Sequence, residues 1–234
     1  MNVTDHIHLE LVPLKGDPFT IHYAGDLAEF FFRANVSSTG DDAYDDWVLK
    51  QNDPHRITRG DIKSVNRTMR ARTPAKCWAS FIKSPKDESW LFAIDADWDL
   101  FATPETEWSR HAVQTRLGEA FKAVMGPHRG AAVTTKVLHI KRPRLFPVCD
   151  SYVAATMGVQ LWDSSDWLSL LELVIHLRKQ GQANLDRLLT IQTRLREAGF
   201  ERTLVRILDA LLWMQANNRG EYVVFAQWLE KTNR

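Results

Sequence analysis

Cysteine is scarce in this chain, with only Cys77 and Cys149 among 234 residues. Two thiols cannot form a disulfide framework, a zinc knuckle or a four-cysteine iron–sulfur motif. The eight histidines show no HExxH motif and no other spacing typical of metal ligands. The sequence therefore predicts a protein that uses no metal ion and no other cofactor.

Long apolar runs are also missing. The richest stretch, Leu204 to Met214, is interrupted by Arg206 and Asp209, and it falls short of the roughly 18 apolar residues that a membrane-spanning helix needs. Residues 1–6 lack the basic-then-apolar order of a signal peptide. We therefore expect a soluble, cytoplasmic protein that does not associate with a membrane.

The net charge is close to zero, with 30 basic and 29 acidic residues, so total charge says nothing about partners. The distribution along the chain is uneven, because residues 120–149 include six basic residues and no acidic one. Such a segment fits a surface that faces a polyanion, and it fits ordinary solvated surface equally well.

Apolar periodicity and capping signals predict a mainly α fold. At roughly 150 residues per domain, the chain forms a single helical domain over residues 1–234 or divides into two lobes, about 1–100 and 101–234, with a cleft between them. We expect extended structure only at residues 19–23 and 90–94. Helices are expected from Asp26 and over residues 58–72, 78–82, 104–125, 166–179, 184–198 and 201–216, followed by a short helix near the end of the chain.

The segment 126–153 has an unusual order of breakers and helix formers. Gly126 and Pro127 stop the preceding helix, and a short apolar helix follows over about residues 131–140. Pro143 and Pro147 keep residues 141–149 out of helical conformation. Asp150 then stands where a helix can restart, which makes its carboxylate a candidate N-cap.

Two runs in this segment, Val133-Thr134-Thr135-Lys136-Val137-Leu138 and Phe146-Pro147-Val148-Cys149-Asp150-Ser151-Tyr152-Val153, resemble the helix-hairpin-helix DNA glycosylase superfamily. The resemblance covers about 25 residues. It implies a multi-helix glycosylase-like fold with a helix-hairpin-helix element, double-stranded DNA as the partner, and excision of a modified or damaged base. By this resemblance Asp150 matches the catalytic aspartate, and Lys136 matches the catalytic lysine that some members carry.

In that family, backbone N–H groups of a hairpin of small residues bind a DNA phosphate, and neighbouring basic side chains add contacts. The hairpin usually reads Gly-hydrophobic-Gly, whereas this chain has Ala132-Val133-Thr134, and the 14 positions from Lys136 to Asp150 are fewer than usual. The residues that the resemblance and the basic stretch together suggest as DNA contacts are Arg129, Ala132, Val133, Thr134, Thr135, Lys141, Arg142 and Arg144.

Two further resemblances bear on function. Residues 141–144 and 206–214 are similar to an uncharacterised bacterial family of comparable length, which supplies no activity. A more distant likeness is to phage-defence glycosylases, which remove modified cytosines from viral DNA. That likeness suggests hypermodified cytosine in phage DNA as one substrate.

The chemistry explains why an aspartate and a lysine would be needed. Cleavage of an N-glycosidic bond builds positive charge on the sugar, which a fixed carboxylate stabilises while it activates water. A desolvated lysine can instead attack C1′ and form a Schiff base. Two alternatives remain open: a helical module that binds DNA without catalysis, and an all-α protein that binds a protein partner.

Overall fold

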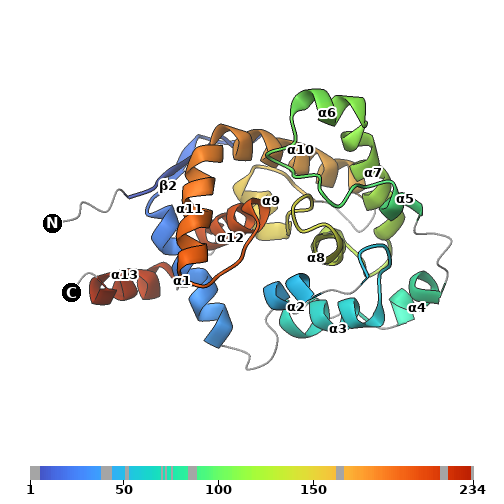
Figure 1. Ribbon diagram of the computed structural model, residues 1–234, viewed down its shortest axis with the longest axis horizontal. Coiled ribbons are helices and arrows are strands. Elements are labelled where there is room, and N and C mark those ends of the chain that lie inside the picture. The colour runs from blue at the N-terminus through green and yellow to red at the C-terminus, as the bar shows by residue number, and fades with distance from the viewer. Residues whose placement is uncertain are drawn as a thin grey trace.

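The computed structural model describes residues 6–37, 44–50, 53–69, 71, 73–74, 76–83, 89–161, 166–216 and 221–232. Within them the chain is mainly helical, as predicted (Figure 1). The elements are, in chain order, β1 (Leu9–Leu11), β2 (Phe19–Ile21), α1 (Ala24–Ser37), α2 (Tyr44–Lys50), α3 (Arg59–Thr68), α4 (Lys76–Lys83), α5 (Ser89–Phe92), α6 (Glu105–Arg110), α7 (Val113–Val124), α8 (Ala131–Lys141), α9 (Ser151–Thr156), α10 (Trp167–Ala183), α11 (Leu185–Glu197), α12 (Leu204–Ala216) and α13 (Glu221–Thr232).

Helices α8 and α9 occupy the middle of the molecule (Figure 1). On the left of that view lie the strands with α1, α11, α12 and α13, on the right lie α4, α5 and α7, and α2 and α3 lie below α8. The buried apolar residues form one cluster that draws on both sides. In α8, Val137, Leu138 and Ile140 are fully buried, so this helix is an internal element for most of its length.

The extended segment predicted near residue 20 is confirmed. It forms β2, which pairs with β1 in an antiparallel hairpin with Leu9 opposite Ile21. The hairpin loop rests on the end of α9, where Leu14 N–H donates to the Met157 carbonyl at 2.9 Å. Gly158 has φ +69° at this crossing, and a Cβ there would lie 2.2 Å from the Lys15 carbonyl oxygen, so the close approach requires glycine.

The helix predicted from residue 58 starts as expected, because Thr58 and Asp61 form a capping box. The Asp61 carboxylate accepts from the Thr58 N–H at 2.7 Å, and the Thr58 hydroxyl accepts from the Asp61 N–H at 3.3 Å. The helix, α3, ends at Thr68, four residues earlier than predicted.

The single helix predicted over residues 104–125 is wrong, since the structure has two helices there. Ala112 is left-handed, with φ +49°, and separates α6 from α7. Trp108 and Val113 are both buried. Five residues apart in one continuous helix they would point about 140° away from each other, so the break lets both face the core. Pro104 stands at the N-cap of α6.

The strand predicted at residues 90–94 is also wrong. Residues Ser89–Phe92 form the short helix α5, and Trp90, Leu91 and Ile94 are buried. That spacing places the three side chains on one side of a helical turn, whereas an alternating strand would bury every second residue.

The helix predicted over residues 166–179 is longer in the structure, since α10 continues through Gly181 to Ala183. A Cβ on Gly181 would lie 2.4 Å from the ring of Phe101. This glycine therefore permits close packing of an aromatic ring on the helix rather than ending it. None of the helices in the described part of the chain is both long enough and apolar enough to cross a lipid bilayer.

Candidate functional site

The hairpin between α7 and α8 is a tight turn over residues 126–129. Gly126 and Arg129 exchange two backbone hydrogen bonds, of 3.3 and 2.8 Å, and His128 has φ +60°. Gly130 is the N-cap of α8. Ala132, Val133, Thr134 and Thr135 therefore lie within the first turns of this helix. Gly126 and Pro127 supply the turn, and Ala, Val and Thr continue the helix, so these four residues do not form the hairpin turn itself.

The two threonines of α8 are fully buried and bond inward. The Thr134 hydroxyl donates to the Arg129 carbonyl at 3.0 Å. The Thr135 hydroxyl accepts from the Cys149 N–H at 3.0 Å and donates to the Ala131 carbonyl at 2.9 Å. Their side chains do not face solvent, so the structure does not support them as DNA contacts. Thr135 instead joins α8 to the segment that precedes α9.

Asp150 is the N-cap of α9, as predicted. Its Oδ1 accepts hydrogen bonds from the backbone N–H groups of Tyr152 (2.9 Å) and Val153 (3.1 Å). No other described residue donates to the carboxylate, so Oδ2 is not engaged within the described part of the chain. The side chain is partly exposed. One oxygen is thus fixed by the helix, and the other remains to meet a ligand.

Lys136 lies in the middle of α8 and is partly buried. Its Nζ donates to the Met69 carbonyl at 3.1 Å, at the C-cap of α3. Burial lowers the pKa of Lys136 below its ordinary value, and the Asp150 carboxylate opposes that shift. Lys136 and Asp150 are therefore close enough to interact electrostatically. The contact between Thr135 and Cys149 explains this, because each of these residues immediately precedes one of the pair.

Behind this pair lies a buried ion-pair network that the sequence did not reveal. Asp209 accepts from the Val148 N–H at 2.8 Å and pairs with Arg206, one turn earlier on α12. Arg206 also holds Asp45 of α2 through its Nε at 2.7 Å. Burial raises the pKa of Asp209, which Arg206 and the Val148 N–H oppose. The network fixes the backbone two residues before Asp150.

Two of the predicted DNA contacts are internal. Lys141 is 2% exposed, and its Nζ lies 2.7 Å from Asp61 Oδ2. Arg142 is 1% exposed, and its guanidinium donates to the carbonyls of Leu91, Ile94 and Pro54 at 2.9, 2.9 and 2.6 Å. The structure therefore contradicts the prediction that Lys141 and Arg142 contact phosphate, because both side chains are buried and bind partners inside the protein.

The remaining predicted contacts keep some exposure. Arg129 is partly buried, donates to the Cys77 carbonyl at 3.3 Å and lies 5.4 Å from the ring centroid of Trp78. Ala132 and Val133 are partly exposed in the first turn of α8. The side chain of Arg144 is 49% exposed, with its Nε 3.3 Å from Asp99.

An aromatic residue that sequence reasoning did not single out stands beside Asp150. Tyr152 is 49% exposed, and its ring meets Trp213 of α12 edge-on, with centroids 6.5 Å apart. An exposed ring two residues past a candidate catalytic carboxylate can stack on a base. The sequence could have indicated Tyr152, because this residue follows the predicted N-cap Asp150 by two positions.

Cys149 is fully buried, and burial raises the pKa of its thiol well above the ordinary value, with the Asp209 and Asp150 carboxylates adding to the effect. A thiol in this environment stays protonated and is a poor nucleophile. Among the described residues, no three His, Cys, Asp or Glu side chains are grouped so that they could hold a metal ion.

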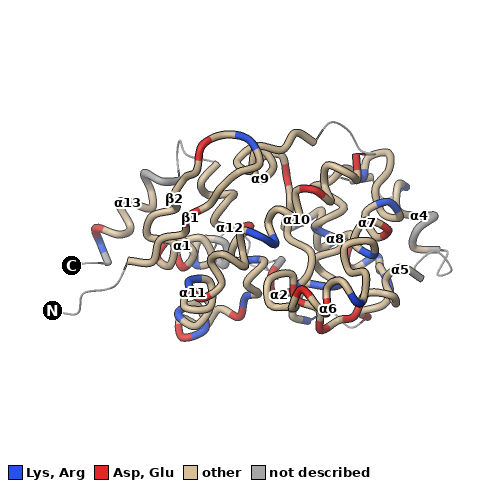
Figure 2. The backbone as a smooth tube through the Cα atoms, turned by 90° about the horizontal axis from the view of Figure 1, so that it is seen from above, with Lys and Arg blue, Asp and Glu red and all other residues tan. Residues whose placement is uncertain are grey.

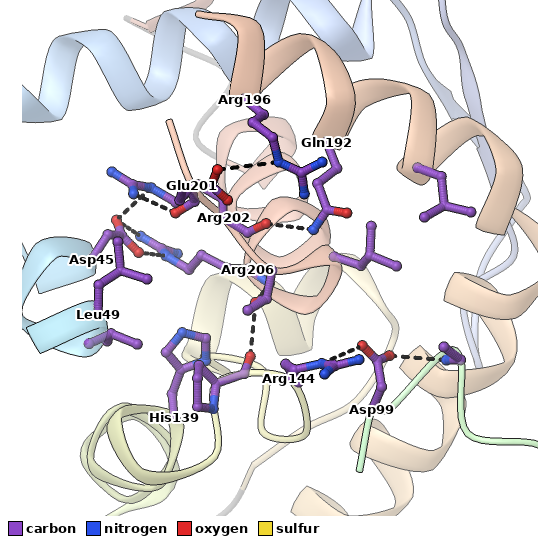
Figure 3. A pocket seen from close by; sticks show the side chains of 16 residues that line it. Asp45, Leu49, Asp99, His139, Arg144, Gln192, Arg196, Glu201, Arg202 and Arg206 are labelled. Atoms are coloured by element: carbon purple, nitrogen blue, oxygen red, sulfur yellow. Dashed lines mark hydrogen bonds and ion pairs between the residues drawn. The ribbon is translucent and has the colours of Figure 1, made fainter. Parts of the chain in front are cut away.

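A separate pocket of about 380 Å³ opens between α2, the loop after α8, and helices α11 and α12 (Figure 3). Arg144, Arg196, Arg202 and Arg206 line it together with Asp45, Asp99 and Glu201. Neither Lys136 nor Asp150 is among the residues that line this pocket.

His139 also lines the pocket, although it is 1% exposed. Its Nδ1 lies 2.6 Å from the Phe146 carbonyl oxygen. A carbonyl can only accept, so Nδ1 carries the proton in this contact. Burial lowers the pKa of His139 to about 4, with a further contribution from Arg206, and the imidazole is therefore neutral at pH 7.

Charge is mixed across the backbone as a whole. Figure 2 shows basic and acidic segments interspersed along the length of the molecule. The basic stretch at residues 120–149 is thus not one basic surface, because Lys141 and Arg142 point inward.

A family model described as a family of unknown function (DUF6308) matches residues 24–216. The match covers most of the chain, so the chain belongs to this family, in agreement with its likeness to an uncharacterised family. No curated protein matches the chain, and no solved structure matches it.

Proposed function

We propose that this protein is a DNA N-glycosylase that removes a modified or damaged base, with Asp150 as its catalytic carboxylate. The observation that carries the proposal is the hydrogen bonding of the Asp150 carboxylate. One oxygen accepts two backbone N–H groups, the other is not engaged by any described residue, and a partly buried lysine lies close by.

The geometry suits stabilisation of a positively charged sugar. As the bond from C1′ to the base breaks, the base leaves with the bonding electron pair and takes up a proton, and the sugar becomes an oxocarbenium ion. Asp150 Oδ2 can face that charge and orient the water that adds to C1′. Because the carboxylate is already fixed by Tyr152 and Val153 N–H groups, it needs little reorganisation during the reaction.

Lys136 supports a second route on the same site. Its lowered pKa increases the fraction of neutral amine, which can attack C1′, displace the base and form a Schiff base. Its bond to the Met69 carbonyl uses an N–H group, so the lone pair of the neutral amine remains available for attack. Hydrolysis through Asp150 alone does not require Lys136 to lose its proton.

Binding of double-stranded DNA would use the residues that retain exposure. Arg129, Ala132, Val133 and Arg144 remain candidate contacts. Lys63 and Arg67 add two exposed cations on α3, which packs against α8. Phosphate contacts of this kind make binding weaken steeply as salt concentration rises.

The test is release of a base from DNA. Purified protein is incubated with duplexes carrying uracil, 8-oxoguanine or hypoxanthine, and with phage genomes containing hypermodified cytosine, and abasic sites are measured after alkaline cleavage. We expect Asp150→Asn to reduce base release by about 100-fold or more. Asp166→Asn, at the N-cap of α10, is the matched control and should retain activity.

Full activity of Asp150→Asn would remove the assigned role. Salt-sensitive DNA binding without base release from any of these substrates would favour the non-catalytic DNA-binding module. Absence of DNA binding at low salt would favour a protein that binds another protein.

Borohydride trapping tests Lys136 separately. If the lysine forms a Schiff base, a covalent protein–DNA adduct appears with the wild type and with Lys122→Met, a control at an exposed position of α7, and disappears with Lys136→Met. Base release by the wild type without any adduct would assign the reaction to Asp150 and water alone.

A further inference from the structure

The segment that leads into Asp150 is buried but belongs to no helix or strand. Residues 146–149 are enclosed, and no strand in the described part of the chain pairs with them. Buried peptide groups need hydrogen-bond partners, and Pro147 has no N–H to offer. Side chains from two helices supply partners here, so the position of the segment depends on those side chains.

Three such contacts hold the segment, and each joins a buried side chain to a peptide group. They are His139 to the Phe146 carbonyl (2.6 Å), Asp209 to the Val148 N–H (2.8 Å) and Thr135 to the Cys149 N–H (3.0 Å). Asp209 differs from the other two because it is an acid and comes from α12, 61 positions further along the chain. It therefore ties the segment to a distant element.

The two oxygens of Asp209 have separate partners. Oδ2 accepts from the Val148 N–H, and Oδ1 pairs with Arg206, one turn earlier on α12. Arg206 in turn binds Asp45 through its Nε at 2.7 Å, as Figure 3 shows. Because both oxygens are engaged and the arginine is itself held, the carboxylate is fixed with Oδ2 toward the segment.

Asp209 is charged at mildly alkaline pH although it is 2% exposed. Burial raises its pKa to about 7, which Arg206 and the Val148 N–H oppose, so the carboxylate is mainly ionised at pH 8. A hydrogen bond to an ionised acceptor is roughly twice as strong as one between neutral groups. A buried ion pair adds little net stability compared with apolar residues of similar volume. The charge therefore points to fixing a peptide group rather than to stabilising the fold.

This anchor lies close to the candidate catalytic carboxylate. Val148 and Asp150 are two positions apart, a span of at most about 7 Å. On the other side, the Asp150 carboxylate is bound by the Tyr152 and Val153 N–H groups at the start of α9, and α9 packs against α12. A shift of about 1 Å at a catalytic group can cost about 100-fold in rate, so an anchor at this distance can govern the reaction.

We propose that Asp209 is a positioning residue for Asp150. Its carboxylate, oriented by Arg206, holds the Val148 peptide so that Asp150 stays in place to meet the sugar, and Asp209 itself does not touch the substrate. The inference rests on the catalytic role proposed for Asp150, and it adds to that role a residue from a distant part of the chain.

The N-cap contacts of Asp150 test this hold without DNA. In the described contacts only Asp150 binds the N–H groups of Tyr152 and Val153. Their rates of exchange with water, measured by NMR magnetisation transfer at pH 8, therefore report how well the carboxylate is held. The Ser169 N–H, bound by Asp166 at the N-cap of α10, is the reference in the same spectrum.

Asp209→Asn is the first variant. Asparagine has the same shape but offers one acceptor oxygen instead of two. Arg206 competes for that oxygen as a charged donor, which leaves the amide nitrogen against the Val148 N–H. We expect exchange at the two cap N–H groups to become about tenfold faster, with no change at the reference.

Asp99→Asn is the matched control. Asp99 is also buried, pairs with Arg144 and accepts a backbone N–H, but in the described contacts its carboxylate binds no residue of the segment, so cap exchange should match the wild type. Arg206→Lys is the second variant. It loses the planar fork that joins Asp45 and Asp209, and we expect about threefold faster cap exchange.

Cap exchange equal to that of the wild type in Asp209→Asn would overturn the proposal, and if that variant does not fold, Arg206→Lys decides in the same way. An equal increase at the Ser169 reference would show general loosening of the protein and would also reject the proposal.

The base-release assay adds the catalytic readout. We expect Asp209→Asn to lower kcat by about tenfold or more and to leave KM for the duplex unchanged, because Asp209 does not contact DNA. Full kcat despite faster cap exchange, or a raised KM with normal kcat, would overturn the positioning role.

The two measurements separate this proposal from the proposed function. Faster cap exchange in Asp209→Asn together with no base release by the wild type would keep the hold on Asp150 and reject the glycosylase. Base release by the wild type with unchanged cap exchange in the variant would reject the hold and keep the glycosylase.

Discussion

Helix α8 carries two lysines five positions apart that have opposite surroundings. Lys136 is partly buried, donates to one carbonyl and lies near Asp150. Lys141 is almost fully enclosed and paired with Asp61. The comparison teaches that a run of positive charge in sequence does not define a basic surface: the end of α8 turns its charges into the protein, and only the middle keeps a lysine near solvent.

The largest expected effect concerns the buried end of this region. Arg142→Met removes the donors to the carbonyls of Leu91, Ile94, Pro54 and Lys141, so four acceptors lose this partner in one substitution. We expect the free energy of unfolding to fall by about 4 kcal/mol or more. Urea denaturation measures it. Arg144→Met, two residues later and 49% exposed, should cost no more than about 1 kcal/mol, and equal losses would erase the contrast between the two arginines.

The next effect depends on pH. His139 has a folded-state pKa of about 4 against an ordinary value near 6.5. Between these values the unfolded chain binds the proton more readily, so stability is fully present above about pH 6.5 and is lost as pH falls toward 4. The loss from this residue approaches about 3 kcal/mol.

Urea denaturation at a series of pH values between 4 and 7 measures how steeply the free energy of unfolding changes with pH. We expect His139→Gln to flatten it and His55→Gln, at an exposed position, to leave it unchanged. The same slope in wild type and His139→Gln would show that other groups cause the acid sensitivity.

A smaller effect tests the link between Lys136 and Asp150. Thr135→Val keeps the shape of the side chain but leaves the Cys149 N–H without its acceptor. We expect a loss of about 1–3 kcal/mol in stability. Thr190→Val, which removes an exposed hydroxyl that bonds the Asp186 carbonyl one turn earlier, should change stability by less than about 0.5 kcal/mol. Equal effects of the two changes would mean that the bridge between α8 and residue 149 contributes little.

The smallest expected effect is that of Asp150→Asn on stability. Asparagine caps a helix about as well as aspartate, so thermal unfolding should shift by less than about 0.5 kcal/mol in free energy. A much larger loss would mean that the charge itself holds α9 in place, and reduced base release by this variant would then not report on catalysis.

The local signals in the sequence predicted the helical elements well where capping and periodicity agreed. Asp150 marked the start of α9, because a cap depends on residues only three positions apart. The division between α6 and α7 was missed for the opposite reason. It depends on burying Trp108 and Val113 against distant parts of the chain, which no local pattern reports.

The candidate site combines a sequence-based hypothesis with contacts that only the structure shows. The neighbourhood of Lys136 and Asp150 followed from a short resemblance, while the partners that fix it come from elsewhere in the chain. Arg206 and Asp209 looked like interruptions of an apolar helix, and their role appears only when α12 packs beside residue 148. Likewise the sequence predicted a surface cation at Arg142, because three of its carbonyl partners lie about 50 and 88 positions away.

The contact between Gly181 and Phe101 has a consequence for the history of this family. With only 2.4 Å between the ring and the place of a Cβ, position 181 cannot gain a side chain while the phenylalanine stays in place. A relative that acquired alanine or serine at 181 would survive most easily if a smaller side chain had already replaced the phenylalanine, so substitutions at these two positions should occur together across the lineage.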